Sequence, residues 1–213
     1  MPDRIANEIR MSIIEGRLLP GRKLNAEEIA ASLSVSRTPV REAFRILEMQ
    51  GLVEVNARRG VFVKSSSLKD LIDVGNLRSV LESLAVCLSL TSEDKQAWIS
   101  SLRLITSEMR QSVIGKPLID CHTKFHKLLV SHSDNKKLSI ILESIQTEVN
   151  MYMYFLDGSY DDAFAMAKEH DELIDTIEKG DALLVARVVE NHVTDGLSKL
   201  VKNWGRQVKG SAQ

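Results

Sequence analysis

The chain has 213 residues, of which 44% are hydrophobic and 5% aromatic, so it has room for two modest domains with aliphatic cores. The net charge of −1 by itself argues against a nucleic-acid partner, but residues 1–64 carry +3 and residues 65–213 carry −4. No apolar run approaches the ~20 residues of a membrane-spanning helix, and from the first residues we expect no signal peptide. We therefore expect a cytoplasmic protein without a membrane partner, in which Cys87 and Cys121 stay reduced.

Two helices are predicted before residue 35. The first spans Asp3–Glu15, where isoleucines recur on one face, and Gly16 is placed to end it. The second begins after Asn25, which is a favourable N-cap, and Glu28 follows three residues later as in a capping box.

The helix that follows Ser36 has two distinct faces. Its apolar residues recur at the spacing of a buried stripe, formed by Val40, Ala43, Phe44 and Leu47. On an adjacent sector, one turn apart, lie Arg37, Arg41 and Arg45. A short helix that is anchored on one side and offers arginines near its N-terminus is the element that reads a DNA major groove. A solvated basic helix face is the alternative interpretation.

The elements that follow favour the DNA-binding interpretation. Residues 52–55 and 61–63 are β-type runs on either side of a turn that carries Arg58 and Arg59 at its tip. Three helices followed by a two-stranded wing predict a winged helix-turn-helix over residues 1–64. A charge of +3 is small, so we expect a homodimer, which doubles the contacts with double-stranded DNA.

Four segments of this region resemble the N-terminal domain of GntR-type bacterial transcription factors, namely Leu19-Pro-Gly-Arg-Lys-Leu-Asn25, Val35-Ser-Arg-Thr-Pro-Val-Arg-Glu-Ala43, Gly51-Leu-Val53 and Arg59-Gly-Val-Phe-Val63. The resemblance implies that Arg37 and Arg41, with Thr38 between them, contact a palindromic operator. It also implies that Gly60 approaches the minor groove. One position departs from the family pattern, because Glu27 stands where a basic residue often touches DNA.

The second half of the chain is predicted to be entirely helical. Residues 65–68 form a short polar linker, and residues 69–205 show neither strand-like alternation nor a Gly-rich phosphate loop. Capping and breaking residues divide this region into six helices, at 68–90, after 91–94, and at 117–132, 135–156, 161–179 and 181–204. The predicted fold is therefore mainly α, a winged helix-turn-helix followed by a six-helix antiparallel bundle, with a loose tail at 206–213.

All five histidines lie in the helical half, and four of them fall at helix positions that can face one interior. His122 and His126 are four residues apart on one predicted helix, and His170 and His192 lie on two others among apolar residues. Neutral imidazole is a common ligand of zinc and similar metals. The spacing leaves two interpretations open, a metal site and hydrogen-bonded core histidines.

Residues 68–205 resemble the FCD effector domain of one GntR branch, through Arg78-Ser-Val-Leu-Glu82, Phe125-His126, Asn135, Glu169-His170 and Asn191-His192. Six helices place the chain in the smaller VanR-like group. The resemblance implies that His126, His170 and His192 bind a divalent metal. The family's fourth ligand is an aspartate, and His122 stands at that position. Four imidazoles favour Zn²⁺, Ni²⁺ or Co²⁺ over Mn²⁺ or Mg²⁺, with zinc or nickel expected first. Loss of the carboxylate could instead leave the site empty.

Family members bind small organic acids beside the metal, and Arg78 is the candidate to pair with such a carboxylate. The alternative for Arg78 is a salt bridge to Glu82, one helical turn away. We therefore expect a ligand-responsive transcription regulator. A regulator in which the metal ion itself is the signal uses the same residues. A zinc hydrolase is a remote alternative, because Thr123 follows His122 where a zinc peptidase needs a glutamate base.

Overall fold

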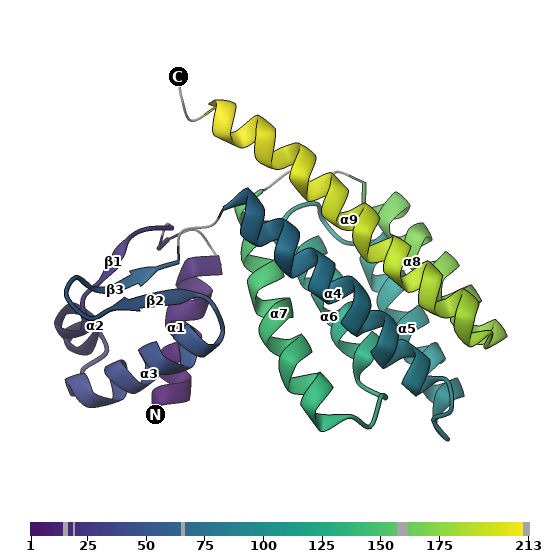
Figure 1. Ribbon diagram of the computed structural model, residues 1–213, viewed down its shortest axis with the longest axis horizontal. Coiled ribbons are helices and arrows are strands. Elements are labelled where there is room, and N and C mark those ends of the chain that lie inside the picture. The colour runs from purple at the N-terminus through teal and green to yellow at the C-terminus, as the bar shows by residue number, and fades with distance from the viewer. Residues whose placement is uncertain (15–16, 19, 65–66, 157–161, 211–213) are drawn as a thin grey trace. The chain divides into compact units, whose positions relative to one another are not determined.

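The protein forms two compact units, Met1–Ser67 and Leu68–Gln213 (Figure 1). The computed structural model describes residues 1–14, 17–18, 20–64, 67–156 and 162–210. Gly16, predicted to end the first helix, and Ser65 and Ser66 of the predicted linker lie outside the described residues. The predicted combination of a winged helix-turn-helix and a helical domain is confirmed.

The first unit is a three-helix core with a small sheet. Its elements are α1 (Pro2–Ile14), β1 (Lys23–Leu24), α2 (Ala26–Ser32), α3 (Arg37–Met49), β2 (Val53–Asn56) and β3 (Gly60–Val63). The strands are antiparallel in the order β1-β3-β2. Strand β1 was not expected from the sequence, because a strand of two residues is too short to produce a recognisable alternation.

Local sequence explains how α2 and α3 begin and end. Asn25 caps α2 by accepting a hydrogen bond from the backbone N–H of Glu27, and its amide donates to the side chain of Glu28. Helix α3 begins after Ser36 and ends before Gly51, which adopts a positive φ of 69° as expected for a residue just past a helix end. Both α1 and α2 pack against α3 and bury its predicted stripe, Val40, Ala43, Phe44 and Leu47.

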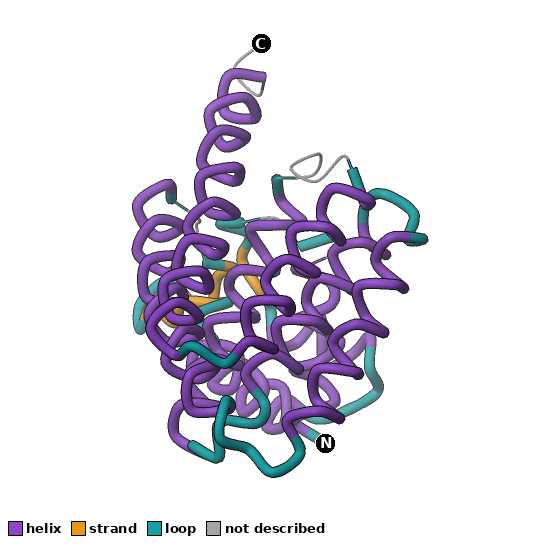
Figure 2. The backbone as a smooth tube through the Cα atoms, turned by 90° about the vertical axis from the view of Figure 1, so that its right-hand side faces the viewer, coloured by secondary structure: helices purple, strands orange, loops and turns teal. Residues whose placement is uncertain are grey.

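The second unit is a bundle of helices (Figure 2). Its core is largely aliphatic. The helices that the structure describes here are α4 (Leu68–Ser89), α5 (Lys95–Arg110), α6 (Lys116–Val130), α7 (Lys136–Phe155), α8 (Ala163–Lys179) and α9 (Ala182–Gly210). Helix α4 packs against α9 and α7, whereas α5 packs against α8 and α6. None of the described helices in either unit is long and apolar enough to cross a membrane.

Helix α9 corrects the predicted boundary of the tail. It continues to Gly210, so most of the segment 206–213 that we expected to be loose is helical, and 211–213 lie outside the described residues. The predicted helix ended at Trp204, just before Gly205, a residue of low helix propensity. A single glycine costs only about 1 kcal/mol inside a helix, and the following Arg-Gln-Val-Lys run contains good helix formers.

Candidate functional site

The exposed N-terminal end of α3 presents the residues predicted to read DNA. Arg37, Thr38 and Arg41 are all exposed there, and Arg45 is exposed one turn further along. In this structure the Arg37 guanidinium forms an ion pair with Glu27, which lies in the first turn of α2. The residue that departs from the family pattern is therefore in direct contact with a predicted base-reading arginine.

The wing places Arg58 and Arg59 in the exposed turn between β2 and β3. The side chain of Asn56 shapes this turn, because its oxygen accepts hydrogen bonds from the backbone N–H groups of both arginines. Gly60 has a φ of 104°, which other residues rarely adopt, and an added Cβ would lie 3.2 Å from Cε of Lys23. Lys23 was not predicted as a neighbour of the wing, because only the pairing of β1 with β3 brings it there.

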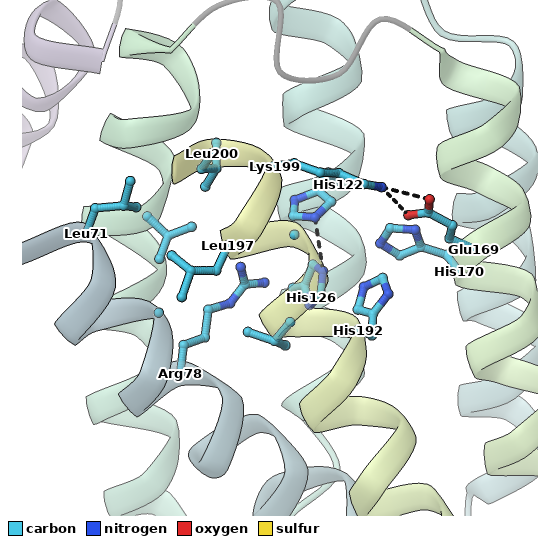
Figure 3. A pocket seen from close by; sticks show the side chains of 14 residues that line it. Leu71, Arg78, His122, His126, Glu169, His170, His192, Leu197, Lys199 and Leu200 are labelled. Atoms are coloured by element: carbon cyan, nitrogen blue, oxygen red, sulfur yellow. Dashed lines mark hydrogen bonds and ion pairs between the residues drawn. The ribbon is translucent and has the colours of Figure 1, made fainter. Parts of the chain in front are cut away.

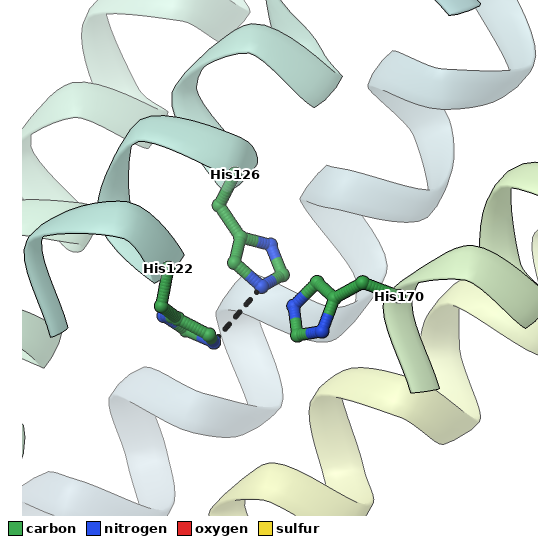
Figure 4. Close-up of side chains that lie close together, drawn as sticks. All are labelled: His122, His126 and His170. Atoms are coloured by element: carbon green, nitrogen blue, oxygen red, sulfur yellow. Dashed lines mark hydrogen bonds between the residues drawn. The ribbon is translucent and has the colours of Figure 1, made fainter. Parts of the chain in front are cut away.

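Three histidines of the second unit converge in its interior (Figure 4). His122 and His126 lie one turn apart on α6, and His170 comes from α8. All three are buried, and each offers a ring nitrogen such that these atoms all lie within 4.8 Å of one another. The Nε2 atoms of His122 and His126 are 3.1 Å apart. The predicted convergence of α6 and α8 on one cluster is thus present in the structure.

A buried carboxylate fixes the orientation of His126. Glu82 of α4 accepts a hydrogen bond from Nδ1 of His126 at 2.9 Å and pairs with Nε of Arg78 at 2.6 Å. The proton on Nδ1 leaves the Nε2 lone pair of His126 directed at the cluster. Both Glu82 and Arg78 are almost fully buried, and the guanidinium projects into the same pocket as the histidines (Figure 3).

His170 also presents a lone pair to the cluster. Its Nδ1 donates a hydrogen bond to the backbone oxygen of Met166 at 2.7 Å, so Nε2 is the unprotonated nitrogen of the neutral ring. This buried Nε2 has no hydrogen-bond partner among the described residues. A buried nitrogen lone pair without a donor is a costly arrangement, and a metal ion would satisfy it.

His192 of α9 lies beside these three histidines, but it is not among the residues whose ring nitrogens all lie within 4.8 Å of one another. Its ring centroid is 4.5 Å from that of His170 and 5.4 Å from that of His126. Burial lowers the pKa of all four histidines, that of His170 to about 4. The rings are therefore neutral near pH 7, which is the form that binds metals.

The cavity beside the histidines is small. It has a volume of about 30 Å³ and is lined by all four histidines together with Arg78 and apolar residues of α4 and α9. Leu197 of α9 narrows this cavity by packing against Gly75 of α4. A Cβ added to Gly75 would lie only 2.7 Å from the methyl carbons of Leu197. This space corresponds to about one water molecule.

Comparison with known proteins identifies both units. Residues 2–63 match the model of the gntR family of bacterial regulatory proteins, and residues 73–195 match that of the FCD domain. The chain belongs to the GntR family. It is a DNA-binding transcriptional regulator of the GntR/FCD type, and the matching families and relatives are regulators rather than enzymes. This sets the zinc hydrolase alternative aside.

Relatives and solved structures match this chain along nearly its whole length. The regulator is 32% identical to a protein of Paenarthrobacter nicotinovorans named as the probable D-xylose utilization operon transcriptional repressor, over 89% of this chain and 85% of the relative. It is 25% identical to the gluconate operon transcriptional repressor of Bacillus subtilis, over 94% and 85% of the two chains. E. coli McbR/YncC shares the fold, with a TM-score of 0.76, 18% identity, and coverage of 95% and 98%.

Proposed function

We propose that this regulator binds a palindromic operator as a homodimer. Arg37, Thr38 and Arg41 contact base edges in the major groove, where arginine recognises guanine through two hydrogen bonds. Arg58 and Arg59 contact phosphates, and Gly60 lets the wing approach the minor groove. The exposure of these side chains on α3 and on the wing supports this arrangement.

An apolar stripe on α4 supports the homodimer. Helix α4 packs against α9, α7 and α6, and it buries Arg78 and Glu82 together with apolar residues, yet it also has apolar residues on the side that these helices leave exposed. Its exposed side carries Leu77, Val80, Leu84 and Leu88, spaced three or four residues apart and each at least 41% exposed. Exposed contiguous apolar surface of this kind marks a protein interface. A second copy of the chain would cover it with an identical stripe, as in a two-fold dimer.

In the helical unit, we propose that His126, His170 and His192 bind one divalent metal ion, with His122 as the fourth ligand. The single observation that carries this proposal is the buried Nε2 of His170, which faces the other histidines without a hydrogen-bond donor among the described residues. The Glu82–His126 hydrogen bond adds the partner that metal-binding histidines usually have. A donor set of neutral imidazoles favours Zn²⁺ or Ni²⁺.

Arg78 is the proposed contact for a small organic acid. Its Nε is engaged by Glu82, but the buried Nη2 has no hydrogen-bond partner among the described residues. A guanidinium donor next to a cation is suited to a carboxylate. Because the cavity has only about 30 Å³, an acid larger than one water must displace side chains such as Leu197 or move α9 relative to α4. This displacement is the proposed origin of the effector's influence on DNA binding.

The same small cavity favours a second candidate function, a regulator for which the metal ion is itself the signal. Measurements of operator binding in which the metal and the organic acids are varied independently distinguish the acid-responsive from the metal-responsive regulator. An acid effector changes operator affinity only in metal-loaded protein, and the change is lost in Arg78→Ala. A metal signal changes affinity without any acid. If elemental analysis and titration after chelation detect no ion that binds below roughly millimolar, the metal site is wrong and both candidates fail.

A further inference from the structure

A second cavity lies between α6 and α7, on another side of His126. Its volume is about 230 Å³, and its lining shares only His126 with the smaller cavity at the histidine cluster. Glu82, His126 and Gln146 are its buried polar residues, whereas Lys127 and Glu143 are exposed and mark its opening to solvent. Solvent therefore has a route to the residues that orient His126, without passing the histidine cluster.

The polar groups of this cavity mostly accept hydrogen bonds. The hydroxyls of Ser131 and Ser139 already donate to the backbone oxygens of Leu128 and Asn135, so their remaining capacity is that of acceptors. Gln146 donates one amide N–H to Asn150, which leaves its carbonyl oxygen as an acceptor beside one further N–H. The Glu82 carboxylate holds two hydrogen bonds and has lone pairs for more. A ligand that suits this lining must carry several hydrogen-bond donors.

Charge and size narrow the class of ligand. Arg78 neutralises Glu82, so the interior of the cavity favours an uncharged group, whereas Lys127 and Glu143 offer one charge of each sign at the opening. The volume of about 230 Å³ equals that of roughly seven water molecules, which suits a molecule of about ten non-hydrogen atoms. Val130 and Leu142 provide an apolar wall for C–H groups.

We propose that this cavity binds a small polyhydroxylated molecule of five or six carbons, a sugar or its aldonic acid. Its hydroxyls donate to Glu82, Gln146 and the two serines, its carbon skeleton lies on Val130 and Leu142, and a terminal carboxylate, where there is one, pairs with Lys127. A cationic amine would also satisfy the acceptors, but it finds no uncompensated carboxylate, because Arg78 pairs with Glu82 and Lys127 balances the charge of Glu143 at the opening. Nothing in this assignment requires the metal.

Occupation of the cavity also affects the histidine cluster. A hydroxyl that donates to Glu82 withdraws negative charge from the carboxylate that accepts from His126 Nδ1, and that bond sets the orientation and basicity of His126. The polyol and the metal therefore influence each other's affinity, by the same factor in both directions. This coupling rests on the metal site proposed above, whereas polyol binding does not.

Calorimetry with the full chain tests the proposal in zinc-loaded and in chelated protein, with D-xylose, D-glucose, D-gluconate and the diamine putrescine as probes. Ser139→Trp places an indole in the cavity, and Ser100→Trp is the matched control. Both serines are exposed on helices, and both hydroxyls donate to the carbonyl four residues earlier. We expect at least one polyol to bind in both states, Ser139→Trp to weaken it by about tenfold or more, and Ser100→Trp to leave it unchanged.

Zinc affinity, measured by competition with a chelating dye, should shift by about threefold or more at saturating polyol in wild-type protein and not in Ser139→Trp. The assignment is overturned if no polyol binds below about 10 mM, if Ser139→Trp binds polyol as wild type does, or if putrescine binds in its place. An unchanged zinc affinity at saturating polyol overturns the coupling alone. Absence of zinc binding, with polyol binding intact, contradicts the metal site and leaves the polyol site standing.

Discussion

Glu82 accepts a hydrogen bond from Nδ1 of His126 at 2.9 Å, across the contact between α4 and α6. This bond holds the His126 ring in the tautomer whose Nε2 faces the other histidines. We expect Glu82→Gln to weaken zinc binding by roughly 10- to 100-fold, because the amide supports this tautomer less well and raises the basicity of the ring less. Competition titration with a chelating dye measures the change.

Glu178→Gln is the matched control for this substitution. Glu178 also accepts a hydrogen bond from an arginine, Arg103, but on the exposed surface between α5 and α8. The zinc affinity of the Glu178→Gln protein should equal that of the wild type. Equal zinc affinity of Glu82→Gln and wild type, with both proteins folded by circular dichroism, would remove Glu82 from the proposed site.

Stability of the metal-free protein should depend on pH through the buried histidines. Burial lowers the pKa of His170 from 6.5 to about 4, and it lowers those of His122, His126 and His192 as well. As the pH falls below 6.5, the unfolded chain takes up protons before the folded one. The free energy of unfolding therefore decreases, by up to about 1.4 kcal/mol per pH unit for each histidine, until the folded pKa is reached.

Urea unfolding between pH 7.5 and 4.5 in the presence of a chelator checks this dependence. Both tryptophans of the chain, Trp98 and Trp204, belong to the helical unit, so their fluorescence follows that unit alone. Residues 1–64 contain no histidine and contribute nothing to this effect. A stability that stays constant over this range would show that the imidazoles are not buried in the neutral form.

The helices and strands of this chain follow from local sequence patterns, whereas the contacts between them do not. The stripe of α3 and the spacing of His122 and His126 follow from helical periodicity, which is visible in the chain itself. Asp120 is the carboxylate two residues before His122, and the same periodicity places it on another face of the helix. In the structure Asp120 is exposed and accepts a hydrogen bond from Tyr154. By contrast, the bond between Glu82 and His126 joins residues 44 positions apart.

Packing between helices accounts for what the sequence did not reveal. Which face of α4 meets α6 depends on how side chains of several helices interlock, and no local pattern encodes it. The small volume at the histidines also arises this way, from the close approach of Gly75 and Leu197. The sequence contained one usable signal for Glu82, its position four residues after Arg78 on a helix with few charged residues.

Leu84 offers a test of the homodimer. Introducing a charge into the apolar stripe of α4 should dissociate the dimer, because a buried unpaired carboxylate at an interface is strongly unfavourable. We expect Leu84→Glu to sediment as a monomer and to lose most of its operator affinity. Leu104→Glu, which changes an exposed leucine of α5, should remain a dimer. Dimeric Leu84→Glu protein would place the interface elsewhere.

Arg41 and Arg58 should differ in how they contribute to DNA binding. We expect Arg41→Ala to cost about 1–3 kcal/mol on the native operator and to relax specificity at one base pair of each half-site. Arg58→Ala should weaken binding to all sequences alike and reduce the salt dependence of binding. Fluorescence anisotropy with operator and scrambled duplexes at several salt concentrations separates the two. The assignment of Arg41 fails if its loss affects both duplexes equally.

The ion pair between Glu27 and Arg37 leads to a prediction of opposite sign. Glu27 holds the Arg37 guanidinium in the free protein and places a negative charge at the surface that faces DNA. We expect Glu27→Gln to increase operator affinity by a few-fold, since exposed ion pairs contribute only about 0–1 kcal/mol and the repulsion from phosphates is removed. Glu28→Gln is the control, because Glu28 is exposed on the same turn of α2 but bonds to Asn25. The increase should shrink at high salt, where repulsion is screened. If Glu27→Gln instead weakens binding to the operator and not to scrambled DNA, Glu27 positions Arg37 for base recognition rather than opposing it.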